Sequence, residues 1–223
     1  MAHPIRWRVV LATMLLAATM PSAGAKDGRL RIGIKGDVAS LDPHVLNETL
    51  THGVLSNVME GLVRRDADLK LRPGLATRWE TLSPLHWRFH LRKGVRFHDG
   101  APFTASDVLF TFERARKPRS QMRSRIPDGA LIIAVGSHTV DVHLEKPNPI
   151  LPANWESLLI MSRPWAERHG LTDPGAVPQP APGLPANGTG PYRVISHRTG
   201  HITRFERHPR WWGEARGIAR RVD

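Results

Sequence analysis

The stretch WRFHLRKGVRFHDGAPFTASDVLFTFERARK, residues 87–117, decides the fold of this chain. Its first part alternates apolar and polar side chains on either side of a Lys-Gly turn at 93–94. The apolar members of this alternation are Trp87, Phe89, Leu91, Val95 and Phe97. A period of two is typical of half-buried strands, so the pattern predicts a β-hairpin over residues 87–97, ended by the Asp-Gly dipeptide at 99–100.

The second part of the stretch predicts a capped helix over residues 104–117. Thr104 is a good N-cap, and Asp107 can complete a capping box and place its negative charge in the first helical turn. The residue before the cap and the fourth helical residue are apolar and predict a hydrophobic staple, Phe103 with Val108. A proline directly after the stretch ends the helix. We therefore expect a strand pair that runs into a helix and packs against it.

The composition limits the kinds of protein that the chain can be. It has 223 residues, a formal net charge of +12, a sequence pI of about 11.3 and no cysteine. A strongly basic chain favours anionic partners, but scattered charges also fit an arginine-rich composition without such a partner. The absence of cysteine excludes disulfides, cysteine zinc sites, a cysteine nucleophile and a lipid anchor on cysteine.

Residues 1–25 predict a secretory signal peptide. Two arginines lie near the N-terminus, an uncharged and mainly apolar segment follows at 9–20, and an Ala-x-Ala cleavage site ends at Ala25. The apolar segment is too short to cross a bilayer. We therefore expect export to the periplasm with cleavage after Ala25.

Periodic patterns along the rest of the chain predict mainly short strands. Helices are expected at 47–64, where Asn47 is a plausible cap, and at 150–161. Strands are expected at 30–34, 62–65, 69–71, 131–135, 139–145, 192–196 and 201–207. The proline-rich stretch 174–187 predicts a surface linker.

The stretch 87–117 closely resembles family 5 extracytoplasmic solute-binding proteins, the oligopeptide, dipeptide and nickel receptors of ABC importers. The family patterns Leu-Arg-Lys-Gly-Val, Phe-His-Asp-Gly and Thr-Ala-x-Asp-Val-x-Phe occur at 91–95, 97–100 and 104–110. Two later stretches resemble further family motifs. They are Gly-Thr-Gly-Pro-Tyr at 188–192 and His-Pro-x-Trp-Trp-Gly at 208–213, the second with His for Asn and Trp for Tyr.

This resemblance implies a mixed α/β, β-rich fold. Residues 26–223 would form part of a family 5 domain of the type 2 periplasmic-binding-protein fold. In it, 26–46 and 187–223 would form the core of lobe I, and 47–186 an inserted subdomain. Family members run roughly twice as long, so we expect this chain to be an N-terminal fragment whose second lobe is missing.

The function implied by the resemblance is that of a periplasmic substrate-binding component of an ABC transporter, which captures peptides or a similar small solute. Its partners would be that solute and an ABC permease in the inner membrane, without nucleic acid or cofactor. The alternative is a basic exported module that binds polyanions. By resemblance, the wall of the ligand cleft would contain Leu41, Asp42, Pro43, Asn47, Gly188, Thr189 and Gly190.

Each of these wall residues also has a structural explanation. Asp42 precedes a proline and fits an Asx turn, Asn47 fits a helix cap, and the Gly-Thr-Gly stretch fits a turn. With only one wall present, residues 26–223 are expected to bind neither peptides nor Ni(II) measurably.

Metal and catalytic chemistry are not expected from the motifs. His86 and His90 are four apart, but on a strand this spacing places them roughly 13 Å apart and facing solvent. The pair His98-Asp99 is explained by the Asp-Gly turn, and no Gly-x-Ser-x-Gly elbow occurs. We therefore expect neither an enzyme nor a metal site.

Overall fold

A computed structural model describes residues 28–176, 186–214 and 219–223. The predicted signal peptide and most of the proline-rich linker lie outside these residues. None of the helices within these ranges is long and apolar enough to cross a membrane.

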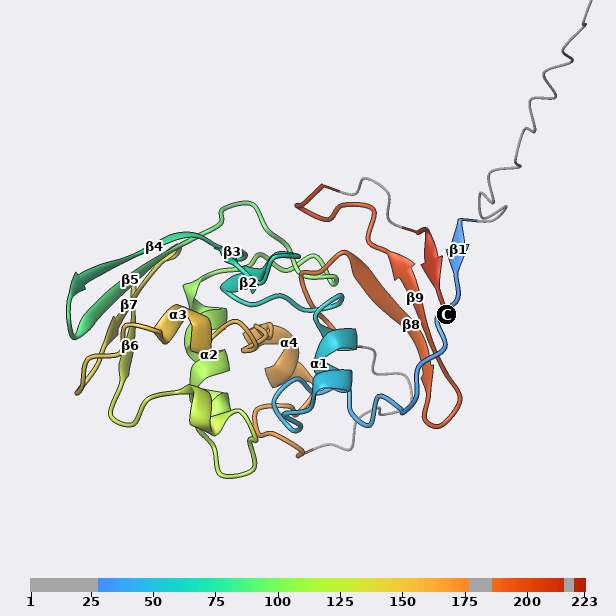
Figure 1. The fold of residues 1–223 in the computed structure, drawn as a ribbon, viewed down its shortest axis with the longest axis horizontal. Coiled ribbons are helices and arrows are strands. Elements are labelled where there is room, and N and C mark those ends of the chain that lie inside the picture. Colours follow the sequence, from blue (N-terminus) through green and yellow to red (C-terminus); the bar gives the residue numbers. More distant parts are fainter. Residues whose placement is uncertain (1–27, 177–185, 215–218) are drawn as a thin grey trace, which may run out of the picture.

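The predicted alternation around residue 89 produces one antiparallel sheet, which we call the hairpin sheet. Its strands follow the order β4-β5-β7-β6. Their bounds are β4 (Ala76–Ser83), β5 (His86–Leu91), β7 (Thr139–His143) and β6 (Leu131–Gly136). Along β5, Trp87, Phe89 and Leu91 are buried and their neighbours are half-buried, as the period of two requires. The hairpin sheet forms one end of the molecule (Figure 1).

A second four-stranded sheet, the terminal sheet, joins segments from the two ends of the described chain. Its order is β1-β10-β9-β8, with β1 parallel to β10 and the other pairs antiparallel. The strands are β1 (Arg29–Leu30), β8 (Tyr192–Arg198), β9 (Ile202–Arg207) and β10 (Arg221–Val222). A small ribbon pairs β2 (Val63–Arg65) with β3 (Leu71–Pro73). The expected hairpins at 131–145 and 192–207 are therefore confirmed.

The helices lie between the two four-stranded sheets (Figure 1). They are α1 (Thr49–Leu55), α2 (Ala105–Ala115), α3 (Leu151–Asn154) and α4 (Arg163–Arg168), with a 3-10 turn at Arg123–Arg125. The capping box and the cap at Thr104 are confirmed, because the Asp107 carboxylate accepts from the Thr104 backbone N–H at 2.8 Å. Phe103 and Val108, the predicted staple, are both buried in the main core.

Helix α2 is buried on two faces rather than one. Val108 and Phe112 pack into the core beneath the hairpin sheet, whereas Phe110 packs against α4 through Trp165. The helix therefore stands between the sheet and α4, and it also buries the charged side chain of Arg114, which is 1% exposed. Neither α4 nor the 3-10 turn was predicted from the sequence.

The prediction of a second strand in the 87–97 hairpin is wrong. Val95 and Phe97 are buried as the alternation requires, but this segment makes only an isolated bridge between Arg96 and Pro102. The reason is that a strand has two edges, and those of β5 are occupied by β4 and β7. Residues 95–97 therefore find no free edge of β5.

The helix predicted at 47–64 is also too long. It ends at Leu55, and its N-cap is Glu48 rather than Asn47, without a side-chain cap bond. The backbone carbonyls of Asn57 and Val58 accept instead from the N–H groups of Tyr192 and Gly190, at 3.0 and 2.9 Å. Pairing with a distant segment thus replaces helical hydrogen bonds.

Three other elements differ from the prediction in length or position. The strand expected at 30–34 covers only two residues, and Ile32 and Ile34 are 55% and 49% exposed, because its partner β10 is equally short. The strand expected at 69–71 starts at Leu71, since Leu69 has a positive φ in the turn before it. The helix expected at 150–161 forms one turn, α3, although the apolar side chains after it are buried.

Candidate ligand-binding wall

The loop that contains Leu41, Asp42 and Pro43 is buried. Leu41 and Asp42 are each 3% exposed, and Leu41 belongs to an apolar cluster with Val58 of the segment after α1. The Asx turn considered for Asp42 is present, because its Oδ1 accepts from the His44 backbone N–H at 3.0 Å. These side chains therefore stabilise the conformation of the loop and present little surface to a ligand.

The Asp42 carboxylate forms a buried ion pair with Arg114 of α2. The guanidinium donates two hydrogen bonds to the carboxylate, with Nη1–Oδ1 and Nη2–Oδ2 distances of 2.8 and 2.5 Å. Burial alone would raise the pKa of Asp42, but the hydrogen bonds and charge of Arg114 outweigh it and hold that pKa below its usual value. No sequence pattern predicted this pair, since the two residues lie on separate elements.

His44 extends this network as a neutral imidazole. Burial, and then the charge of Arg114, lower its pKa to about 4. Its Nδ1 lies 2.8 Å from Arg114 Nη1 and its Nε2 lies 3.0 Å from the Leu159 carbonyl oxygen. Because the guanidinium can only donate, Nδ1 accepts and Nε2 carries the proton. Asp42, His44 and Arg114 thus join the loop after β1 to helix α2.

The Gly-Thr-Gly turn at 188–190 packs directly on backbone. A Cβ at either glycine would overlap backbone atoms of the 57–59 segment, so no larger residue fits without displacement. The ring of His98 lies across the turn, with Nδ1 accepting from the Gly188 N–H at 3.3 Å and Nε2 donating to the Gly190 carbonyl at 3.0 Å. Burial lowers the pKa of His98 to about 4, which keeps the ring neutral for this role.

Glu60 is a functional candidate that the sequence analysis missed. Its carboxylate accepts from Thr189 Oγ1 at 2.7 Å and from the indole N–H groups of Trp211 and Trp212 at 3.2 and 2.7 Å. Burial raises the pKa of Glu60 to about 7 against the opposing effect of these bonds. Arg92 stacks 4.2 Å above the Trp212 ring and adds a positive charge nearby.

The structure therefore brings motifs from three distant parts of the sequence to one place, which we call the motif junction. It comprises Glu60, His98, the 188–190 turn, Trp211 and Trp212. The junction ties the segment after α1 to the strands of the terminal sheet. A signal for Glu60 did exist in the sequence, since a lone carboxylate between buried apolar residues needs partners.

Asn47 lies apart from this junction. It is exposed, and its backbone N–H donates to Gln121 Oε1 at 3.0 Å. Two hollows in the described residues, of about 360 and 520 Å³, are lined by residues outside the predicted wall. Of the seven predicted wall residues, the structure therefore exposes the side chain of Asn47 and buries the other six.

Comparison with known proteins places this arrangement in a family. The family model of the bacterial extracellular solute-binding proteins, family 5, matches residues 70–222. The chain belongs to this family. The motif junction thus lies in a family 5 chain, and the resemblance drawn from residues 87–117 is confirmed.

Two curated relatives resemble the chain over most of its length. YhjP, an uncharacterized protein of Bacillus subtilis (strain 168), is 32% identical over 183 residues, which are 80% of this chain and 29% of that protein. The glutathione-binding protein GsiB of Pectobacterium atrosepticum is 28% identical over 214 residues, 93% of this chain and 39% of GsiB. The chain therefore spans well under half the length of these relatives.

A solved family 5 structure confirms the fold. OppA of Haemophilus influenzae, in complex with RPPGFSPFR, is 26% identical to this chain, with a TM-score of 0.76. The match covers 88% of this chain and 41% of OppA. The mixed α/β fold, matching part of a periplasmic binding protein, is thus confirmed.

Proposed function

We propose that the chain forms one wall of a solute receptor that serves an ABC importer. The observation that carries the proposal is the match of 88% of the chain to OppA in complex with a peptide, at a TM-score of 0.76. The small solute would be a peptide or a molecule of similar size and polarity. The partner would be an ABC permease, and the receptor would act in the periplasm after cleavage behind Ala25.

The contacts of the wall residues support two different roles within this receptor, contact with the ligand and support of the backbone. Asn47 is exposed and can offer its amide to a ligand, whereas the buried loop at 41–43 and the turn at 188–190 would give the rest of the wall a fixed backbone. A binding site needs such rigid support, because displacements of about 1 Å loosen its polar contacts. The lobe organisation, with 26–46 and 187–223 forming one core and 47–186 a subdomain, belongs to the same proposal.

A receptor of this kind obtains affinity by enclosing its ligand between two walls. The match covers 41% of OppA, and residues 26–223 would form one of the two walls. We therefore expect residues 26–223 alone to bind peptides more weakly than about 1 mM, which corresponds to about 4 kcal/mol.

The alternative of a polyanion-binding module rests on the net charge of +12. A salt series separates the two functions, because binding through counterion release weakens steeply as salt rises. The experiment titrates residues 26–223 with heparin and with a pool of di- to pentapeptides at 50 and 200 mM salt. Saturable heparin binding that falls by about 10³-fold or more between these salts would favour the alternative. The proposed function predicts no saturable binding of heparin at either salt, and peptide binding weaker than about 1 mM at both.

A further inference from the structure

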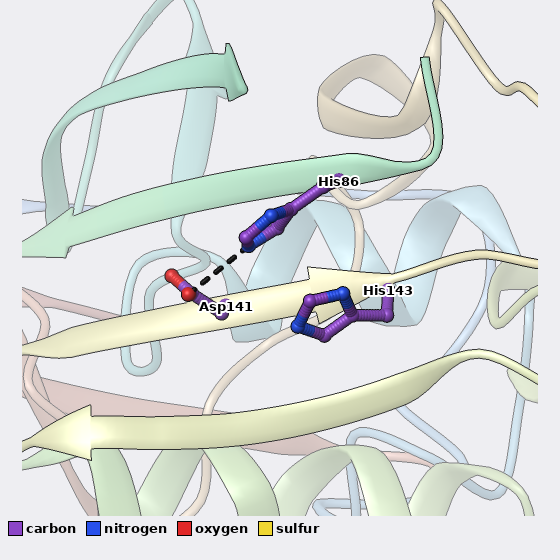
Figure 2. Close-up of side chains that lie close together, drawn as sticks. All are labelled: His86, Asp141 and His143. Carbon is purple, nitrogen blue, oxygen red and sulfur yellow. Dashed lines mark ion pairs between the residues drawn. The ribbon is translucent and has the colours of Figure 1, made fainter. Parts of the chain in front are cut away.

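The outer face of the hairpin sheet carries a cluster of two histidines and one aspartate. His86 on β5 lies directly opposite His143 on β7, and Asp141 lies two residues before His143 on the same face. The ligand atoms of the three side chains all lie within 4.8 Å of one another. Figure 2 shows His86 directed at Asp141, with the ring of His143 beside them. The two imidazole rings stack with their centroids 4.1 Å apart.

We propose that His86, Asp141 and His143 bind one divalent late-transition-metal cation, for which Zn²⁺ is the probe. Imidazole nitrogens and a carboxylate oxygen are ligands that these ions prefer. Two ligand atoms on one tetrahedral zinc ion lie about 3.3 Å apart, given bonds of about 2.0–2.1 Å. The His86 Nε2 to Asp141 Oδ2 distance is already 3.0 Å. The His143 ligand atom lies within 4.8 Å of the other two, and its stacked ring must rotate about its side-chain bonds to reach the same ion.

An unsatisfied atom inside the cluster supports the site independently. His86 Nε2 is shielded from solvent and, despite its 3.0 Å distance to Asp141, has no well-oriented hydrogen bond. A metal ion bound to both groups would give this nitrogen a well-oriented partner. The His86 side chain is still 23% exposed, so an ion can reach the cluster from solvent.

Arg88 positions one ligand of the proposed site and also repels the metal ion that would bind there. Its Nε and Nη2 lie 2.7 Å from Asp141 Oδ1 and Oδ2, which fixes the carboxylate beside the two imidazoles. A carboxylate has about four lone-pair sites, so it can keep this pair and also bind a metal ion. The positive guanidinium nevertheless repels a cation. Removal of this charge is therefore expected to strengthen metal binding, whereas a cluster that serves only as a salt bridge would gain no metal affinity.

The site is independent of the proposed function. It lies on the solvent side of the hairpin sheet, whereas the motif junction and the predicted wall residues lie on other elements. Three protein ligands leave at least one coordination position open for water or a chelating solute. The proposal revises the expectation of no metal site, which considered His86 only together with His90 on the same strand.

Calorimetric titration of residues 26–223, purified without a histidine tag, with Zn²⁺ tests the proposal. The expected result is one saturable site. His86→Ala and His143→Ala each weaken it by at least about 100-fold, since even outer-shell partners of a metal contribute 10- to 100-fold. The matched control is His90→Ala, on the same face of the same strand but beside Glu80, and it leaves the affinity unchanged.

A second measurement does not depend on removing a ligand. Arg88→Gln is expected to tighten Zn²⁺ binding by about fivefold or more, which corresponds to the repulsion of about 1 kcal/mol between unit charges near 4 Å in a water-like dielectric. Circular dichroism checks that each variant is folded. The proposal is overturned if the wild-type chain shows no saturable Zn²⁺ site. It is equally overturned if the site survives in both histidine variants, or if Arg88→Gln does not tighten it.

Discussion

Replacing Arg114 by methionine tests the buried ion pair that joins the loop after β1 to helix α2. Methionine replaces the aliphatic part of the Arg114 side chain but leaves the Asp42 carboxylate, 3% exposed, without its charged partner. Breaking a buried pair in this way costs about 3–5 kcal/mol, because a charge remains in a medium that solvates it poorly. The free energy of unfolding of a small domain is about 5–15 kcal/mol, so the variant is expected to lose a large share of its stability.

Urea unfolding of residues 26–223 at pH 7 measures this loss. The matched control is Arg163→Met, which breaks an exposed ion pair with Glu167 whose Nε–Oε1 distance is 2.8 Å and whose side chains are 53% and 48% exposed. Such a pair contributes about 0.3–0.5 kcal/mol. Equal losses for Arg114→Met and Arg163→Met, both below about 1 kcal/mol, would refute the reasoning from burial.

The same pair predicts a pH dependence with a definite sign. Arg114 holds the pKa of Asp42 in the folded chain below its usual value of 3.8, so the folded chain binds fewer protons there than the unfolded chain. The stabilisation is present above the unfolded pKa and is lost as pH falls through the folded pKa. The difference between wild type and Arg114→Met should therefore shrink on acidification below about pH 4.

Three further predictions concern the motif junction and the helices. Gly188→Ala should destabilise the folded chain by several kcal/mol or prevent folding, because the added Cβ overlaps backbone atoms. Gly53→Ala, in the open interior of α1, should instead stabilise the chain by about 0.5–1 kcal/mol. Urea unfolding compares the two variants. Thr104→Ala should cost about 1 kcal/mol through the lost cap of α2, and an unchanged midpoint would contradict the capping box. Glu60 has a folded pKa of about 7, above the ordinary 4.5, so its contribution to stability falls as pH rises between these values. The stability advantage of wild type over Glu60→Gln should therefore decrease by up to about 3 kcal/mol from pH 5 to pH 8, and a constant difference would contradict this account.

Local signals in the sequence predicted the elements that local chemistry determines. The cap at Thr104, the staple and the alternation along β5 all depend on residues close in sequence, and each is present. Two of the failures share a physical cause. The helix after Asn47 ends early, and residues 95–97 form no strand, because hydrogen bonds to distant segments replace the local ones. Local periodicity carries no information on such replacements.

The candidate sites show the same limit. The turn at Asp42 was predicted, but its partner Arg114 stands 72 residues later on a helix, and no pattern links the two. The cluster of His86, Asp141 and His143 depends on the register between β5 and β7, which spans more than 50 residues. A search for two metal ligands within one strand cannot detect ligands that the pairing of two strands brings together.

The central claim is that this chain supplies one wall of a two-walled solute receptor. The most direct measurement joins residues 26–223 to the part of GsiB that follows the matched region, and titrates the folded, monomeric product and residues 26–223 alone with a pool of di- to pentapeptides in a calorimeter. The account predicts micromolar, saturable, stoichiometric binding by the joined protein and binding weaker than about 1 mM by residues 26–223. Micromolar binding by residues 26–223 alone, or no binding by the folded joined protein, would contradict it.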